Sequence, residues 1–244
     1  MKGRNDENQA PGIPALPADL AEAQQQAVGA IQAAIQAGYR RVQVDIPVAD
    51  LKPETVALPL IYGCEPPMAV VFSDAGSAAL AQRDWPGIPE GMRLCSLGAG
   101  FRVEDGEMLF FVVPSVYAVE QVEQICDRLS QQGSTAPPVI LFNPQLQDAA
   151  TVGVGLAGRR LRDRFITTFE PVYYLQALGS AAVARLFPYP WGVWQQDDEN
   201  RYHLVKSLDH RPNGEELGQI LGQEQSSTEG LWRGIQRFLR VLQG

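Results

Sequence analysis

A glycine-rich stretch has the spacing in this sequence that most resembles a known chemical motif. Gly153, Gly155 and Gly158 follow the pattern GxGxxG, in which glycines let the backbone approach a pyrophosphate at a helix N-terminus. That use requires a strand directly before the first glycine, whereas residues 148–152 have the composition of a loop or short turn. A nicotinamide or flavin site is therefore not the favoured interpretation. We expect no cofactor and no metal.

Basic side chains follow these glycines closely. Four arginines lie within six residues: Arg159, Arg160, Arg162 and Arg164. Guanidinium groups behind flexible backbone suit a phosphate, a carboxylate or an acidic patch on another protein. The alternative is a solvated face on which Asp163, Glu170 and other acids pair with the arginines. The sequence leaves both interpretations open, an anion- or partner-binding site and a structural one.

Two polar residues follow directly after apolar segments. Asp74 comes after residues 67–73 and Asn143 after residues 139–142, each of which has the pattern of a buried strand. In a parallel sheet both would lie at the carboxyl edge, where open α/β folds place their ligands. We therefore add both to the candidate anion- or partner-binding site. Asp74 in Ser-Asp-Ala-Gly is also a common turn and helix-cap residue.

Aromatic residues are dense over residues 187–194. Tyr189, Trp191 and Trp194 lie there close to two prolines and a glycine. Large rings held by rigid prolines are typical of a partner surface. A loop that fills the core would have the same composition, so that alternative stays open.

The familiar signatures of enzymes are missing from the sequence. There is no GxxxxGK[ST] phosphate loop and no GxSxG nucleophile elbow, and the two histidines, His203 and His210, lie near no metal-binding motif. The acidic groups at residues 104–107 and 197–199 have the pattern of solvated turns. The sequence therefore favours a non-enzymatic protein without settling the point.

The elements that must position these residues predict an α/β fold, a mainly parallel sheet with flanking helices. Residues 41–47, 67–73, 108–113 and 139–142 are the expected parallel strands, with a helix over 19–37, a short one over 77–83 and a crossover helix over 114–132. In the C-terminal half, strands over 172–178, 192–196 and 202–208 lack long crossovers between the last two, which predicts an added antiparallel hairpin. A further helix is expected over residues 213–221. We expect a flexible tail (1–13), a single α/β domain (14–222), and a linker with an amphipathic helix (223–244).

Composition and charge limit the possible partners. The chain has 244 residues, a formal net charge of −8 and three scattered cysteines. A net negative charge disfavours binding to nucleic acid, and scattered cysteines are typical of a reducing compartment. No apolar run reaches the ~18–20 residues that a membrane span needs. We expect a cytoplasmic, soluble protein with no transmembrane segment.

Several segments, taken in order, resemble a family of unknown function from cyanobacteria and plastids. They are residues 17–41, FSDAGSAALAQRDW (72–85), VILFNPQLQD (139–148), GVGLAGRRLRDRF (153–165), TFEPVYYLQAL (168–178) and residues 187–194. The resemblance spans about residues 14–221, and the ordered set is more specific than any one motif. This chain departs from it at Phe-Pro-Tyr-Pro-Trp (187–191), where a glycine is expected before the second proline.

The resemblance implies a function rather than a reaction. The family includes a chloroplast protein known for low photosystem II accumulation, and a similar domain is appended to a chloroplast adenylate kinase. It has no established catalytic residues to carry over. By similarity, we expect an auxiliary protein that binds photosystem subunits or other assembly factors, with peripheral association to the thylakoid membrane. The alternative is a protein or enzyme that binds a phosphorylated small molecule or nucleotide through residues 153–164.

Overall fold

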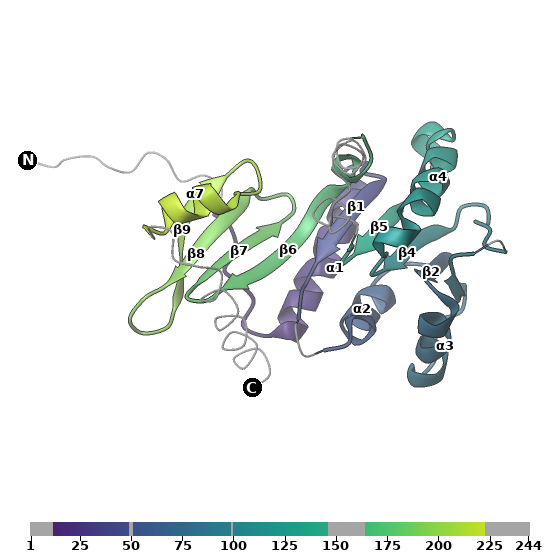
Figure 1. The fold of residues 1–244 in the computed structure, drawn as a ribbon, viewed down its shortest axis with the longest axis horizontal. Coiled ribbons are helices and arrows are strands. Elements are labelled where there is room, and N and C mark those ends of the chain that lie inside the picture. Colours follow the sequence, from purple (N-terminus) through teal and green to yellow (C-terminus); the bar gives the residue numbers. More distant parts are fainter. Residues whose placement is uncertain (1–11, 49–50, 99, 146–163, 223–244) are drawn as a thin grey trace, which may run out of the picture.

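The fold is a nine-stranded mixed sheet with helices on both faces, as seen in a computed structural model that describes residues 12–48, 51–98, 100–145 and 164–222 (Figure 1). The strand order is β3-β2-β4-β5-β1-β6-β7-β8-β9. The strands are β1 (Arg41–Asp45), β2 (Met68–Phe72), β3 (Met92–Ser96), β4 (Met108–Val112), β5 (Val139–Phe142), β6 (Glu170–Leu178), β7 (Ala181–Leu186), β8 (Trp191–Gln196) and β9 (Tyr202–Leu208).

The sheet divides into a parallel and an antiparallel part. All pairings from β3 through β6 are parallel, and β6 to β9 form an antiparallel meander. The predicted α/β class, with antiparallel strands added in the C-terminal half, is therefore confirmed. The central parallel strands β2, β4 and β5 are short and apolar on both faces because helices cover both faces.

Helices α1 (Leu20–Gln36), α2 (Pro53–Tyr62) and α3 (Ala75–Asp84) cover one face of the parallel strands, and α4 (Val119–Ser130) covers the other. Figure 1 shows α2 and α3 on the side of the sheet opposite α4. Short 3-10 turns lie at η1 (Val116–Ala118), η2 (Gly133–Thr135) and η3 (Ile166–Thr168), and α7 (Gly214–Ile220) packs on the antiparallel strands.

Polar caps fix where several helices begin. The carboxylate of Asp19 accepts the backbone N–H of Glu22 at the start of α1, at 2.7 Å. Asn213 and Glu216 form a reciprocal capping box at the start of α7. Such caps each stabilise a helix by about 1 kcal/mol. Both helix starts agree with those expected from the sequence.

A buried ion pair fixes the outer part of the parallel sheet. Glu107 is only 3% exposed and receives two hydrogen bonds of 2.6 Å from the Arg93 guanidinium, while the Glu104 backbone N–H donates to it at 3.1 Å. Burial by itself would raise the pKa of Glu107, but the hydrogen bonds and charge of Arg93 outweigh it and hold this pKa below 4.5.

Replacing Glu107 is expected to make the free energy of unfolding depend less on pH in the acid range. Because the pKa of Glu107 is lowered in the folded state, its contribution is present above pH 4.5 and is lost as pH falls. We expect Glu107→Gln to lower the free energy of unfolding by about 1–3 kcal/mol at pH 7, with the difference narrowing below pH 4. Urea titrations at both pH values measure it. The control is Glu104→Gln, which replaces an exposed carboxylate 3.5 Å from Arg93. If the free energy of unfolding of Glu107→Gln differed from that of the wild type by the same amount at both pH values, the lowered pKa assigned to Glu107 would be contradicted.

Candidate binding site at the carboxyl ends of β2 and β4

The direction of the chain connections reverses between β2 and β4. After β2 the chain runs through α3 to β3 on one side, and after β4 it runs through α4 to β5 on the other. The two helices also cover opposite faces of the sheet. Neighbouring strands whose connections leave in opposite directions open a crevice at their carboxyl ends, and open α/β folds bind ligands there. The fold therefore places its expected ligand position between β2 and β4.

A crevice with a cavity volume of about 400 Å³ lies at this position. Its lining comes from the carboxyl ends of β2 and β4 and from the first residues of α2, α3 and η1: Pro53, Glu54, Phe72, Ser73, Asp74, Ser77, Val112, Val113, Ser115 and Tyr117. We call these residues the switch-point crevice. Its volume is within the ~300–1,000 Å³ of typical small-ligand sites.

Asp74, one of the predicted site residues, lies in the wall of the crevice and caps α3. Its carboxylate accepts the backbone N–H of Ser77 at 2.9 Å and the Ser77 hydroxyl at 2.8 Å. These hydrogen bonds hold the pKa of Asp74 below its ordinary value, the Ser77 backbone N–H contributing most. Asp74 is therefore a fixed negative charge, with both carboxylate oxygens already used within the helix turn.

Two hydrogen bonds of the Ser73 hydroxyl join the two loops that line the crevice, and we call this pair of bonds the latch. The Ser73 hydroxyl accepts the Ser115 backbone N–H at 3.0 Å and donates to the Val113 carbonyl at 3.4 Å. Val113 has a φ of +47°, a left-handed conformation that is costly for a β-branched side chain. Backbone strain of this kind is concentrated at functional sites. The strained valine and the latch thus give the crevice a defined shape.

Tyr117 lies at the rim of the crevice and is 96% exposed, the most exposed large hydrophobic side chain in the described part of the chain. An exposed tyrosine beside a hollow is typical of a contact that is completed by a partner. Among the described residues, the lining includes two carboxylates, Glu54 and Asp74, but no histidine, cysteine, lysine or arginine. This arrangement suits recognition of a polar group with an apolar neighbour, and it lacks a matched acid and base.

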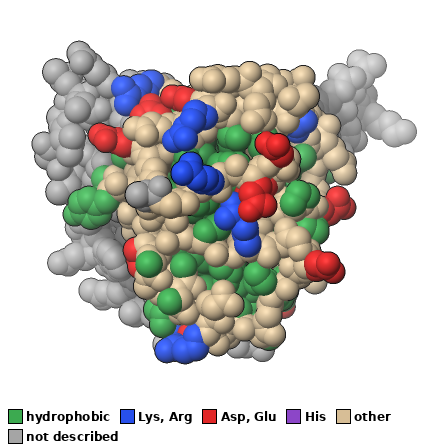
Figure 2. Space-filling model, turned by 90° about the vertical axis from the view of Figure 1, so that its right-hand side faces the viewer, with side chains coloured by type: hydrophobic (Ala, Val, Ile, Leu, Met, Phe, Trp, Pro, Cys, Tyr) green, Lys and Arg blue, Asp and Glu red, His purple; other side chains and the backbone are tan. Residues whose placement is uncertain are grey.

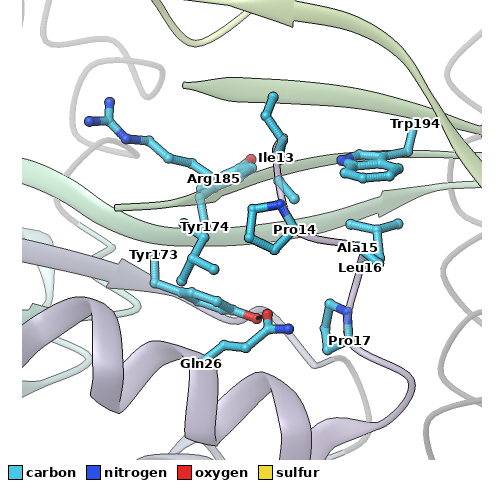
Figure 3. Close-up of a pocket in the computed structure, with 12 residues that line it drawn as sticks. Ile13, Pro14, Ala15, Leu16, Pro17, Gln26, Tyr173, Tyr174, Arg185 and Trp194 are labelled. Atoms are coloured by element: carbon cyan, nitrogen blue, oxygen red, sulfur yellow. Dashed lines mark hydrogen bonds between the residues drawn. The ribbon is translucent and has the colours of Figure 1, made fainter. Parts of the chain in front are cut away.

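A second cavity, between the N-terminal segment and β6–β8, has a volume of only about 20 Å³ (Figure 3). Figure 3 shows Ile13 and Pro14 lying between Arg185 and Trp194 over the strands, with Tyr173 hydrogen-bonded to Gln26 below. This space fits about one water molecule. The Trp194 indole Nε1 is buried, with no hydrogen-bond partner among the described residues. The cavity is too small for a metabolite.

Of the other predicted site residues, those in the described part of the chain lie outside the crevice lining. Asn143 uses its side chain internally, accepting the Ile46 backbone N–H at 2.6 Å and donating to the Ile46 carbonyl at 3.0 Å. Arg164 is bound to Glu123 of α4, with Nε 2.8 Å from a carboxylate oxygen. The expected partner Glu170 instead pairs with Arg185. Six predicted residues lie outside the described part of the chain: Gly153, Gly155, Gly158, Arg159, Arg160 and Arg162.

The aromatic cluster is largely internal. Trp191 and Trp194 are 2% and 5% exposed, and Tyr189 is half-buried. Trp191 lies against Tyr174, with ring centroids 5.2 Å apart, in a small apolar cluster beside α7. Within the described structure these rings therefore pack on the protein itself rather than on its surface.

Sequence reasoning found Asp74 but missed the residues around it. Ser73, Val113, Ser115 and Tyr117 come from two loops that are about 40 residues apart in the chain. The signal that could have found them is positional: each loop follows directly after an apolar strand of a parallel sheet. What the sequence could not supply was the strand order that makes β2 and β4 neighbours.

The fold is a mixed α/β domain with a crevice at a topological switch point of its sheet. The model of a family described as a domain of unknown function, DUF1995, matches residues 17–219. The chain belongs to this family, and the match covers most of the crevice-bearing domain. Searches of curated proteins and of solved structures each returned no match.

The described helices are too short or too polar to cross a lipid bilayer. Within the same residues, no group of three or more histidine, cysteine, aspartate and glutamate side chains lies close enough to hold a metal ion.

Proposed function

We propose that this protein is an auxiliary binding factor of the photosynthetic apparatus, acting in photosystem II assembly or maintenance at the periphery of the thylakoid membrane. The observation that carries the proposal is the switch-point crevice with Tyr117 at its rim. The link to photosystem II rests on the sequence resemblance, and the crevice supplies the surface through which such a factor would bind.

The chemistry of the crevice favours binding over catalysis. The Ser73 hydroxyl is used in the latch and the Ser77 hydroxyl in the cap of α3. The Ser77 hydroxyl donates to the Asp74 carboxylate at 2.8 Å, but the lowered pKa of Asp74 makes this carboxylate a weak base for activating a nucleophile. Tyr117 supplies a large ring that loses little conformational entropy when a partner covers it. A protein segment that places an apolar side chain against Tyr117 and a polar group toward Glu54 fits this arrangement.

Replacing the rim tyrosine is expected to weaken the partner complex. We expect Tyr117→Ala to reduce the recovery of photosystem II subunits with the tagged full chain at least fivefold, since exposed aromatic anchors commonly contribute more than about 1 kcal/mol. The measurement is quantitative mass spectrometry of complexes purified from a cyanobacterial host. Leu80→Ala on α3 is the matched control, because Leu80 is 47% exposed but lies outside the crevice lining. Equal recovery with both variants would contradict the proposal.

A second candidate function is the binding of a phosphorylated small molecule in the same crevice. It is favoured by the cavity volume and by the N-terminal ends of α2 and α3, which lie beside the cavity. The test is thermal unfolding with adenosine phosphates and sugar phosphates at millimolar concentration. A ligand at 100 times its Kd stabilises the folded state by about 2.7 kcal/mol. A shift that Tyr117→Ala and Ser77→Leu abolish would favour this candidate over the protein partner.

A further inference from the structure

The two edges of the sheet differ in how they are protected against pairing. At β9 the pairing with β8 is interrupted by an irregularity between Val193 and Trp194, and exposed Lys206 lies on the edge strand. Bulges and lysines are the usual devices that stop an edge strand from pairing with another chain. At β3 the register with β2 is regular over all five residues, and the strand contains neither lysine nor proline. The β3 edge therefore lacks the protection that β9 has.

The backbone groups of β3 alternate between its neighbour and the open side. The Gly91 carbonyl accepts the Met68 N–H at 3.1 Å, and the Leu97 N–H donates to the Phe72 carbonyl at 2.8 Å. In a parallel ladder, alternate residues bond to the same neighbour, so Arg93 and Cys95 also point their backbone groups toward β2. Leu94 and Ser96 consequently point theirs outward. Among the described residues, no other backbone or side-chain group bonds to these two residues.

Apolar side chains lie on both faces beside this edge. Trp85, Ile88 and Leu94 pack against the core beneath α1–α3, and Cys95 and Phe101 pack against the core beneath α4. Most of these side chains remain half-buried, because no strand lies beyond β3. Figure 2 faces this side of the molecule and shows hydrophobic side chains interspersed with basic and acidic ones. A strand added beside β3 would extend the apolar layers on both faces of the sheet.

The edge is complementary to itself. Suppose that β3 of a second copy lies antiparallel beside β3, with a twofold axis through Leu94. The two Leu94 residues then form a reciprocal pair of N–H to carbonyl hydrogen bonds, and each Ser96 N–H donates to the Met92 carbonyl of the other copy. The Met92 N–H is already bound to the Pro89 carbonyl, so it needs no partner. Arg93, neutralised by Glu107, would face the uncharged Cys95 of the second copy. No like charges therefore oppose each other along the paired strands.

We infer that the β3 edge is a homodimer interface, in which antiparallel pairing of β3 with β3 of a second copy joins the two sheets. Twofold contacts of this kind are the commonest in soluble oligomers. The interface is separate from the switch-point crevice, because the described crevice lining includes no residue of β3. The inference stands whether or not the crevice binds a photosystem subunit.

The test variant removes the backbone N–H of Ser96, which points away from β2, and keeps the hydrogen bonds between β3 and β2. Ser96→Pro eliminates one N–H, which by symmetry serves two of the four intermolecular hydrogen bonds, and it also places a ring at the contact. We expect the dimer dissociation constant to rise roughly tenfold to a hundredfold. Ser96→Ala, which keeps the N–H, should dimerise like the wild type. Sedimentation equilibrium of the full chain measures all three proteins, and circular dichroism checks their folding.

Four outcomes would overturn the inference. The first three are a wild-type chain that stays monomeric up to roughly 100 μM, a dimer that folded Ser96→Pro leaves intact, and a dimer in which the Leu94 and Ser96 amides exchange hydrogen as fast as in the monomer. The exchange measurement uses the wild type alone, so it decides the matter if the proline variant does not fold. If only a photosystem subunit, and no second copy, protects these amides, the homodimer is also excluded.

Discussion

Replacing Asn143 by alanine is expected to lower the melting temperature by roughly 6–12 °C. The Asn143 side chain joins the ends of β5 and β1, since it accepts the Ile46 N–H and donates to the Ile46 carbonyl in a part-buried position. Alanine leaves both Ile46 groups without these partners, which costs about 3 kcal/mol. For a domain of this size, each kcal/mol corresponds to about 2–4 °C. Differential scanning calorimetry measures the change.

A matched control separates the hydrogen bonds from the backbone conformation. Asn143 has a φ of +44°, and Asn200 has a φ of +60° in the exposed turn between β8 and β9. Both positions disfavour alanine by about 1 kcal/mol, but only Asn143 bridges two strands. Asn200→Ala should therefore lower the melting temperature by only a few degrees. Equal losses in the two variants would show that the contacts with Ile46 contribute nothing.

Asp45→Asn is expected to stabilise the protein at pH 7.5. Burial raises the pKa of Asp45 from 3.8 to about 6, although the hydrogen bond from Gln43 and the charge of Arg211 both act to lower it. Since the folded state binds this proton more tightly than the unfolded state, the contribution of Asp45 to stability is greatest below pH 3.8 and is lost as pH rises through 6. Removing the buried charge should recover about 2–3 kcal/mol at pH 7.5. The melting temperature should rise by roughly 5–10 °C.

The stabilisation by Asp45→Asn should depend on pH. At pH 4 most Asp45 side chains are protonated in the folded state, so the variant and the wild type should melt within about 2 °C of each other. Asp105→Asn, at an exposed turn, is the control and should have little effect at either pH. An Asp45→Asn variant that melts below the wild type at pH 7.5 would contradict the burial argument. So would an equal stabilisation at pH 4 and pH 7.5.

Periodicity and buried apolar runs predicted the elements with strong patterns. Helix α4 has its apolar residues at helical spacing, and β4 and β5 are unbroken apolar runs. The sequence analysis did not predict α2, β3 or β7. Helix α2 contains Pro59, and an internal proline predicts the end of a helix. The sequence of β3 mixes polar and apolar residues without a clear strand pattern. Such elements are stabilised by tertiary packing rather than by local propensity.

The candidate site was predictable only in part, for a physical reason. Asp74 could be placed at the carboxyl end of a strand from its own neighbours along the chain. The crevice depends instead on the pairing of β2 with β4, which brings Ser73 to Ser115. The strain at Val113 likewise arises from its turn after β4 and not from its residue type. Contacts between distant loops follow from topology, which local patterns do not determine.

If the switch-point crevice binds a photosynthetic partner, a reactive group at its rim should crosslink to that partner. The most direct measurement is photo-crosslinking in a cyanobacterial host, with a benzophenone amino acid at position 117 of the full chain and, as control, at position 80. Our account predicts adducts with photosystem II subunits or their assembly factors from position 117 and at most traces from position 80. Adducts of equal identity and yield from both positions, or none from position 117, would contradict it.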